Sequence, residues 1–396
     1  MTVGRPFGAA RFAAVSLISS AIARSRPEVY ACHVLRALTL LCGLIALAGS
    51  SGCASRAASE RSPATYANPV LDSDFPDPAV LKAQDGFYYV YATQGGANGA
   101  VHNIQVARSG NLVEWERLPD ALPSKPAWAS KTQDFWAPHV HEDRGRFYLY
   151  YSAKPDAALT DQSRGLCLAV ATANRPEGPF TDSGRPLQCG PGFVNIDPMA
   201  FDDPATGKRL LYWGSGFEPI KVQELAPDRM SFAAGSAPVD LIHPVKSEDP
   251  AEYQRLIEGA WVVRRGGWYY LFYSGDNCCG PKAHYAALVA RSRSATGPFQ
   301  TLAAATGAAS GVILEQRGIW VAPGHNSVIE DARGDHWMLY HAVDSRSPRS
   351  RPTDEVNTRR VMLIDRIVWR SGWPRLEGDG PSTGARPRPS TRPRTR

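Results

Sequence analysis

Five aromatic-rich stretches decide the fold: FYYVYAT at Phe87–Thr93, FYLYYSA at Phe147–Ala153, RLLYWGS at Arg209–Ser215, YYLFYSG at Tyr269–Gly275 and HWMLYHA at His336–Ala342. Each is a strand-length run of β-forming residues. Aligned on their fifth residues, they recur at steps of 60, 62, 60 and 67 residues. A period near 60 residues, with other short strand-like pieces in each interval, predicts an all-β, five-bladed β-propeller. A β-sandwich with a coincidental aromatic rhythm is the alternative.

The repeats also set the domain boundaries. No convincing long amphipathic helix occurs between Tyr66 and Pro374, so residues 66–377 are predicted to form one propeller domain. Residues 378–396 are rich in Arg, Pro, Ser and Thr, a composition that cannot bury a core. They are predicted to be a disordered basic tail.

The N-terminal region resembles an export signal. Basic residues precede the apolar run ALTLLCGLIALA at Ala37–Ala48, which is too short to span a bilayer. Residues 1–53 are therefore predicted to be a signal peptide, and residues 54–65 a linker. Small residues before Cys53 resemble a lipoprotein signal that would end at this cysteine. The sequence thus predicts an exported protein, either secreted or a periplasmic or outer-membrane lipoprotein, with a lipid anchor as its one membrane contact.

The net charge of the chain does not indicate a macromolecular partner. The formal net charge is +6, but five arginines lie in the last eleven residues, and without its ends the chain is near neutral. A nucleic-acid partner is therefore not expected.

The cysteines of an exported chain favour disulfides over metal ligation. Cys167 and Cys189 are predicted to pair and to close a short excursion. Cys278 and Cys279 are adjacent, and their role stays open. No Cys/His spacing suggests zinc.

The repeat also predicts which side chains meet on the propeller axis. About fifteen residues before each aligned aromatic comes the start of a short apolar run, where an innermost strand should begin. The residues at that offset are two aspartates, a glutamate, an imidazole and an indole: Asp77, Asp197, Glu258, His325 and Trp136.

Three carboxylates gathered at one mouth of a channel are seldom kept for stability, because like charges repel and burial is costly. Glycosidic hydrolysis needs such a cluster, with one carboxyl as acid and one as base. Each residue also has a structural reading: Asp-Pro is a common turn, Glu258 could cap a turn, and His325 or Trp136 could simply pack. The shared offset in separate blades favours a site.

DFPDPAV, FWAPHV, NIDPMAF, IEGAWVV and APGHNSV, in this order, resemble glycoside hydrolase family 43 over Asn68 to Pro374. The resemblance implies an inverting glycosidase with Asp77 as general base, Glu258 as general acid, and Asp197 as the residue that orients the acid and holds its pKa up. Arg360 matches the family's pocket arginine and is predicted to contact the substrate. Trp136 is predicted from its place in the repeat to contact the substrate as a sugar-stacking platform. His325 would help to hold calcium or another cation in the channel through waters.

The same resemblance implies a carbohydrate substrate from plant cell walls, with α-L-arabinofuranosidase or arabinanase activity favoured over β-xylosidase activity. Two further readings stay open: a retaining, invertase-like furanosidase and a non-catalytic sugar-binding propeller. A retaining furanosidase usually has Glu-Cys at the acid, where this chain has Glu258-Gly259. The stretch Ser274–Tyr285 has no assigned role and is placed at the pocket rim.

Overall fold

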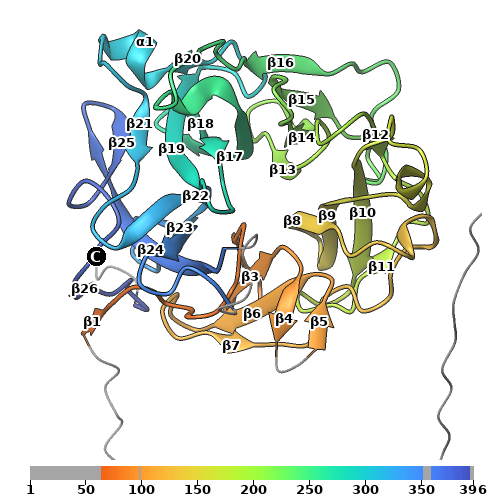
Figure 1. Cartoon of the computed structure of the whole chain (residues 1–396), viewed down its shortest axis with the longest axis horizontal. Coiled ribbons are helices and arrows are strands. Elements are labelled where there is room, and N and C mark those ends of the chain that lie inside the picture. Colours follow the sequence, from red (N-terminus) through yellow and green to blue (C-terminus); the bar gives the residue numbers. More distant parts are fainter. Residues whose placement is uncertain (1–63, 98–99, 351–357, 393–396) are drawn as a thin grey trace, which may run out of the picture. The chain divides into compact units, whose positions relative to one another are not determined.

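The computed structural model describes residues 64–97, 100–350 and 358–392, which lie within one compact unit. Its main elements are five antiparallel sheets of four or five strands, arranged as blades around a common centre (Figure 1). The prediction of an all-β, five-bladed propeller is confirmed. The predicted signal peptide at residues 1–53 lies outside the described residues.

Each blade is built from consecutive strands, numbered from the centre outward. Blade one holds β2 (Ala79–Lys82), β3 (Tyr88–Ala92), β6 (Gln105–Ser109) and β7 (Glu116–Arg117). Blade two holds β8 (Phe135–Asp143), β9 (Arg146–Ala153), β10 (Cys167–Ala173), β11 (Thr181–Asp182) and β12 (Gln188–Cys189). Blade three holds β13 (Met199–Asp202), β14 (Arg209–Trp213), β15 (Ile220–Glu224) and β16 (Val239–Ile242).

The last two blades complete the ring. Blade four holds β17 (Ile257–Arg265), β18 (Trp268–Asn277), β19 (His284–Ser292), β20 (Gln300–Thr301) and β21 (Val312–Leu314). Blade five holds β22 (Trp320–Glu330), β23 (His336–Asp344), β24 (Arg360–Arg370) and β25 (Trp373–Leu376). Outside the blades lie the hairpin β4 (Gly95–Ala97) with β5 (Ala100–His102), the pair β1 (Thr65–Tyr66) with β26 (Arg386–Pro387), and the helices η1 (Ala127–Ala129), η2 (Asp156–Leu159), η3 (Tyr253–Arg255) and α1 (Leu302–Thr306).

The five innermost strands β2, β8, β13, β17 and β22 surround the channel. Each contacts the next in ring order, and β22 contacts β2, so the ring closes. A single cavity is lined by residues from all five of these strands or their first turns, among them Ala79, His139, Met199, Trp261 and Asn326. Positions that are equivalent in the five repeats therefore meet around one axis.

The aligned aromatics form the core between the strands. Tyr91, Tyr151, Trp213, Tyr273 and Tyr340 are all fully buried, each on the second strand of its blade. Each polar tip has a hydrogen-bond partner, as buried Tyr and Trp require. The donor–acceptor pairs are Tyr91 to the Pro176 carbonyl, Tyr151 to Asp182, Trp213 to Asn195, Tyr273 to Gln254 and Tyr340 to Asp365.

The two ends of the described chain close against blade five. Tyr66 Oη donates to the Ile364 carbonyl of β24 at 2.8 Å, and β1 pairs with β26. Residues 378–392, predicted to be disordered, are ordered here. Ser382 is 1% exposed, and its N–H donates to Asp365 Oδ2 at 3.1 Å. The backbone donors of this part of the tail thus find buried acceptors that composition alone does not reveal.

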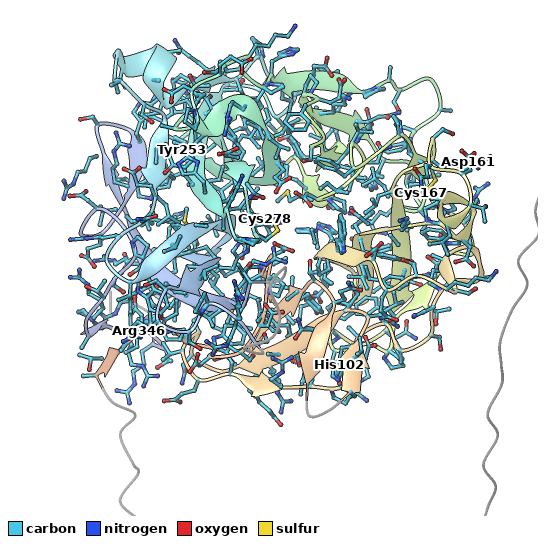
Figure 2. The ribbon with its side chains drawn as sticks, viewed as in Figure 1. His102, Asp161, Cys167, Tyr253, Cys278 and Arg346 are labelled. Atoms are coloured by element: carbon cyan, nitrogen blue, oxygen red, sulfur yellow. A yellow bond between two sulfur atoms is a disulfide. The ribbon has the colours of Figure 1, made fainter. Side chains whose placement is uncertain are left out.

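The predicted disulfide between Cys167 and Cys189 is confirmed, and it joins the paired strands β10 and β12. Figure 2 shows Cys167 in the outer part of blade two and Cys278 near the centre of the ring. Cys278 and Cys279 are also joined by a disulfide.

Candidate active site

Each blade has a residue in the left-handed region of backbone space, either within its innermost strand or two residues before that strand begins. The five residues, one for each blade, are Asp77 (φ 59°), Ala137 (φ 44°), Asp197 (φ 62°), Gly259 (φ 65°) and His325 (φ 48°). This conformation is uncommon for residues other than glycine, and it tends to be kept where a side chain must be held in a particular direction. The repeat offset predicted Asp77, Asp197 and His325 at these positions. Trp136 and Glu258 each lie one residue earlier.

Each of these five residues is held by a hydrogen bond to the preceding blade. In four of the five junctions, a side chain that follows an aligned aromatic accepts the backbone N–H of the next blade's left-handed residue. The pairs are Thr93 with Ala137 (2.7 Å), Ser152 with Asp197 (3.2 Å), Ser274 with His325 (2.8 Å) and His341 with Asp77 (3.1 Å). At the fifth junction, Asp197 Oδ2 itself accepts the N–H of Gly259 at 2.9 Å. Neighbouring blades are thus hydrogen-bonded to one another at one end of the channel. This end, where the five residues lie, is called the mouth.

Asp77 is surrounded by donors and positive charge. Its carboxylate accepts hydrogen bonds from Thr93 Oγ1 at 2.5 Å and from Arg360 Nη1 at 3.1 Å, and its Oδ1 lies 3.4 Å from His325 Nδ1. Burial alone would raise the pKa of Asp77, but the charges of Arg360 and His325 outweigh burial and hold this pKa well below its usual range. These surroundings therefore favour the ionised form of Asp77.

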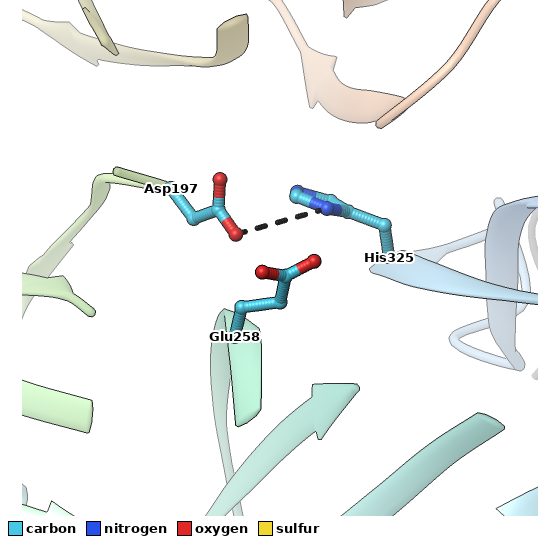
Figure 3. A group of neighbouring side chains, drawn as sticks. All are labelled: Asp197, Glu258 and His325. Atoms are coloured by element: carbon cyan, nitrogen blue, oxygen red, sulfur yellow. Dashed lines mark ion pairs between the residues drawn. The ribbon is translucent and has the colours of Figure 1, made fainter. Parts of the chain in front are cut away.

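Asp197 and Glu258 form a second, contrasting group. Each is less than 10% exposed, and oxygens of the two carboxyls lie with His325 Nδ1 or Nε2 in a group no more than 4.8 Å across (Figure 3). Burial raises the pKa of Asp197 well above its usual range, and the charges of Glu258 and Asp77 raise it further. Burial also raises the pKa of Glu258, and the charge of Asp77 adds to this. Burial therefore favours the protonated form of both carboxyls.

Two hydroxyls hold the Glu258 carboxyl in place. Ser215 Oγ donates to Oε2 at 2.6 Å, and Tyr285 Oη donates to Oε1 at 2.8 Å. Both donors favour the ionised form and so moderate the effect of burial on the Glu258 pKa. Burial is thus the largest cause of the raised pKa of Glu258. The family resemblance implied instead that Asp197 holds this pKa up.

Sequence reasoning missed Ser215 and Tyr285, as well as Thr93 and His341. A signal was present for three of the four, because Thr93, Ser215 and His341 each follow an aligned aromatic by one or two residues. His341 is fully buried, and burial lowers its pKa to about 4, so its neutral Nδ1 can accept the N–H of Asp77. Tyr285 had no repeat signal. It stacks on His341, with 5.7 Å between ring centroids and 4° between planes.

The other predicted site residues lie at the same mouth. Arg360 begins β24 and reaches Asp77, while its own N–H donates to Asp74 at 2.9 Å. Trp136 is half-buried on β8 and opposite Ser152 in the register of β9. Among the described residues, every predicted site position is therefore found at this end of the channel.

The unassigned stretch Ser274–Tyr285 reaches the site at both ends. Ser274 accepts the N–H of His325, and Tyr285 donates to Glu258. Between them, Cys278 Sγ lies 3.8 Å from Arg360 Nη1. This stretch therefore rims the pocket, as the sequence predicts.

Whether a cation fits this group can be judged from the atoms that the protein offers as ligands. Asp197, Glu258 and His325 offer two carboxylates and one imidazole, whereas calcium prefers about six to eight oxygens. A cation bound directly to this group would favour the ionised form of both carboxyls, against the effect of burial on their pKa values. The group therefore does not fit a directly bound calcium, and calcium held by His325 through waters stays a prediction.

Buried carboxyls whose pKa values are raised, beside a carboxylate whose pKa is lowered, are the groups that acid–base cleavage of a glycosidic bond requires. Fold and site together define a glycosidase. Residues 66–374 match the model of glycosyl hydrolases family 43, and the chain belongs to this family.

Known relatives agree with this assignment. A probable arabinan endo-1,5-α-L-arabinosidase A from Aspergillus flavus is 27% identical, over 78% of this chain and 93% of its own. An extracellular exo-α-(1→5)-L-arabinofuranosidase from Cellvibrio japonicus is 25% identical, over 77% of this chain and 86% of its own. A solved thermostable family-43 glycoside hydrolase is 28% identical with a TM-score of 0.65, and covers 82% of this chain and 99% of its own.

Proposed function

We propose that this chain is an inverting glycosidase of plant cell-wall polysaccharide that cleaves α-L-arabinofuranosyl bonds of arabinan or its oligosaccharides. One observation carries the mechanism: neighbouring carboxyls in one pocket have pKa values pushed in opposite directions, down at Asp77 and up at Glu258. Environments that separate two pKa values in this way indicate a base and an acid.

In the proposed reaction, Glu258 holds a proton and donates it to the glycosidic oxygen as the bond to the anomeric carbon breaks. Asp77 takes a proton from a water molecule that attacks the anomeric carbon from the opposite face. Atoms and charge balance, because one proton leaves the acid and one reaches the base. Arg360 keeps Asp77 ionised until it accepts this proton.

Asp197 is proposed to position the acid. Its carboxylate holds the N–H of Gly259, the residue after Glu258, and so orients the start of β17. Burial raises the pKa of both carboxyls, which favours a proton on the acid.

The substrate proposal rests on the relatives, two of which are described as acting on α-1,5-linked arabinose polymers or oligomers. β-Xylosidase activity is the second candidate, since the acids do not distinguish the sugars. The non-catalytic alternative is disfavoured because all three carboxylates are in place.

We also propose export, with lipidation at Cys53, from the N-terminal signal pattern. Within the described residues, no helix is long and apolar enough to cross a membrane.

Proton NMR of a reaction on (1→5)-α-L-arabinobiose tests the activity and the stereochemistry together. The first-formed arabinose should carry the β configuration, the inverse of the α-linked substrate. Release of α-arabinose would instead indicate retention and favour the invertase-like mechanism. Cleavage of xylobiose but not arabinobiose would favour the second candidate.

A further inference from the structure

An exposed aromatic pair lies at the mouth, on the loops of blade three that also carry site residues. Phe217 is 64% exposed, the highest fraction among the large hydrophobic side chains that the structure describes. Its ring meets the half-buried Phe193 edge-on, with 6.2 Å between centroids and 64° between planes. Phe193 comes four residues before Asp197, and Phe217 two residues after Ser215.

These loops lie at the mouth because of the strand register. Met199 at the start of β13 pairs with Tyr212 near the end of β14, so the loop after β14 emerges beside the entry to β13. The N–H of Gly214 donates to the Ile196 carbonyl at 3.1 Å, which joins the two loops. Ser215 then reaches Glu258, so Phe217 belongs to the same turn as a group that contacts the proposed acid.

The backbone is specialised to present Phe217. This residue has a φ of 65°, in the left-handed region that bulky side chains rarely adopt. The turn is closed by the N–H of Glu218 on the Ser215 carbonyl at 3.2 Å. A Cβ at Gly216 would lie 2.8 Å from Val194 Cγ1, so only glycine lets the two loops approach this closely. Strain kept to expose an aromatic ring indicates a function for that ring.

The loop beneath Phe193 is also held firmly. The N–H of Leu166 donates to the Gly192 carbonyl at 2.8 Å, and the indole of Trp213 donates to Asn195 at 3.2 Å. The Cys167–Cys189 disulfide lies at the base of this loop. A preorganised aromatic surface of this kind binds without a large ordering cost.

We propose that Phe217, supported by Phe193, is the platform for the sugar on the leaving-group side of the scissile bond. This inference rests on the proposed function, because the acid must face the leaving oxygen and Phe217 shares a turn with Ser215, which contacts that acid. An aromatic face carries a negative quadrupole and attracts the C–H bonds of a sugar ring, while burying apolar surface of both. The ligand class is therefore a neutral sugar unit.

The test compares two substrates whose leaving groups are both alcohols. Methyl α-L-arabinofuranoside releases methanol, whereas (1→5)-α-L-arabinobiose releases a sugar. Phe217→Ala should lower kcat/KM about tenfold on arabinobiose, which corresponds to about 1.4 kcal/mol. The loss on the methyl glycoside should be clearly smaller. Phe217→Tyr should restore most of the arabinobiose activity, because it keeps the ring.

The matched control is Phe87→Ala. Phe87 is 40% exposed and precedes β3, at the end of blade one away from the mouth, so both substrates should react as in the unaltered protein. Equal losses on both substrates with Phe217→Ala, or no loss on arabinobiose, would overturn the platform. If the protein cleaves only xylosides, the arabinofuranosyl proposal fails and the same comparison of xylobiose with methyl β-D-xyloside still decides the role of Phe217. A protein inactive on both pairs would overturn both proposals.

Discussion

Removing the phenol of Tyr285 should move the pH dependence of the reaction in a defined direction. Tyr285 is 1% exposed and donates to Glu258 Oε1 at 2.8 Å, a bond that favours the ionised carboxylate. In Tyr285→Phe this support is lost, so the pKa of Glu258 rises. The proposed acid then keeps its proton to higher pH, and the basic limb of the kcat/KM profile shifts upward.

The size of the shift follows from the bond. A hydrogen bond to a charged group contributes about 1.5 to 3 kcal/mol, and one pH unit corresponds to about 1.4 kcal/mol. Ser215 continues to donate to Oε2 in the variant, so we expect the lower end, about one pH unit. Phe keeps the ring stacked on His341, so the pocket wall should stay in place.

The assay is kcat/KM against pH on arabinobiose, for the unaltered protein, Tyr285→Phe and a control. Tyr273→Phe is a matched control, since Tyr273 is equally buried but donates to Gln254 rather than to the site. Its basic limb should not move. A limb that stays in place or moves to lower pH in Tyr285→Phe would refute the reasoning, because Glu258 would then not be the group that sets it.

Three further predictions concern the acid, the base and the disulfide. Glu258→Gln should lower kcat/KM at least about 100-fold on arabinobiose but far less on a nitrophenyl arabinofuranoside, whose leaving group needs little protonation; equal losses would mean that Glu258 is not the acid. Asp77→Asn should reduce both reactions alike, because each needs the activated water. Cys167→Ser should lower the free energy of unfolding by about 3 kcal/mol, the value expected for a crosslink across 22 residues, and an unchanged Tm in calorimetry would contradict this.

The amino-acid sequence alone was sufficient to predict the fold and the three carboxylates. In a propeller, a position within the repeat also specifies a distance from the axis, so a shared offset brings distant residues together. Asp77 and Asp197 could be found in this way although 120 residues separate them. The left-handed positions of blades two and four are Ala137 and Gly259, each one residue after the site residues Trp136 and Glu258 that the offset predicts.

Other features depended on the tertiary structure. Tyr285 contacts Glu258 across the bulged pairing of β17 with β18 and through β19, and no repeat marks it. The C-terminal segment reads as disordered from composition, yet Ser382 accepts a hydrogen bond from Asn68, 314 residues earlier. The pattern of residue types along the sequence predicts which residues lie on one face of a strand or at one position of a repeat. It cannot report which donors and acceptors from different blades meet, because that depends on how the ring closes. The physical reason is that such bonds form only after the blades have packed, when burial requires every polar group to find a partner.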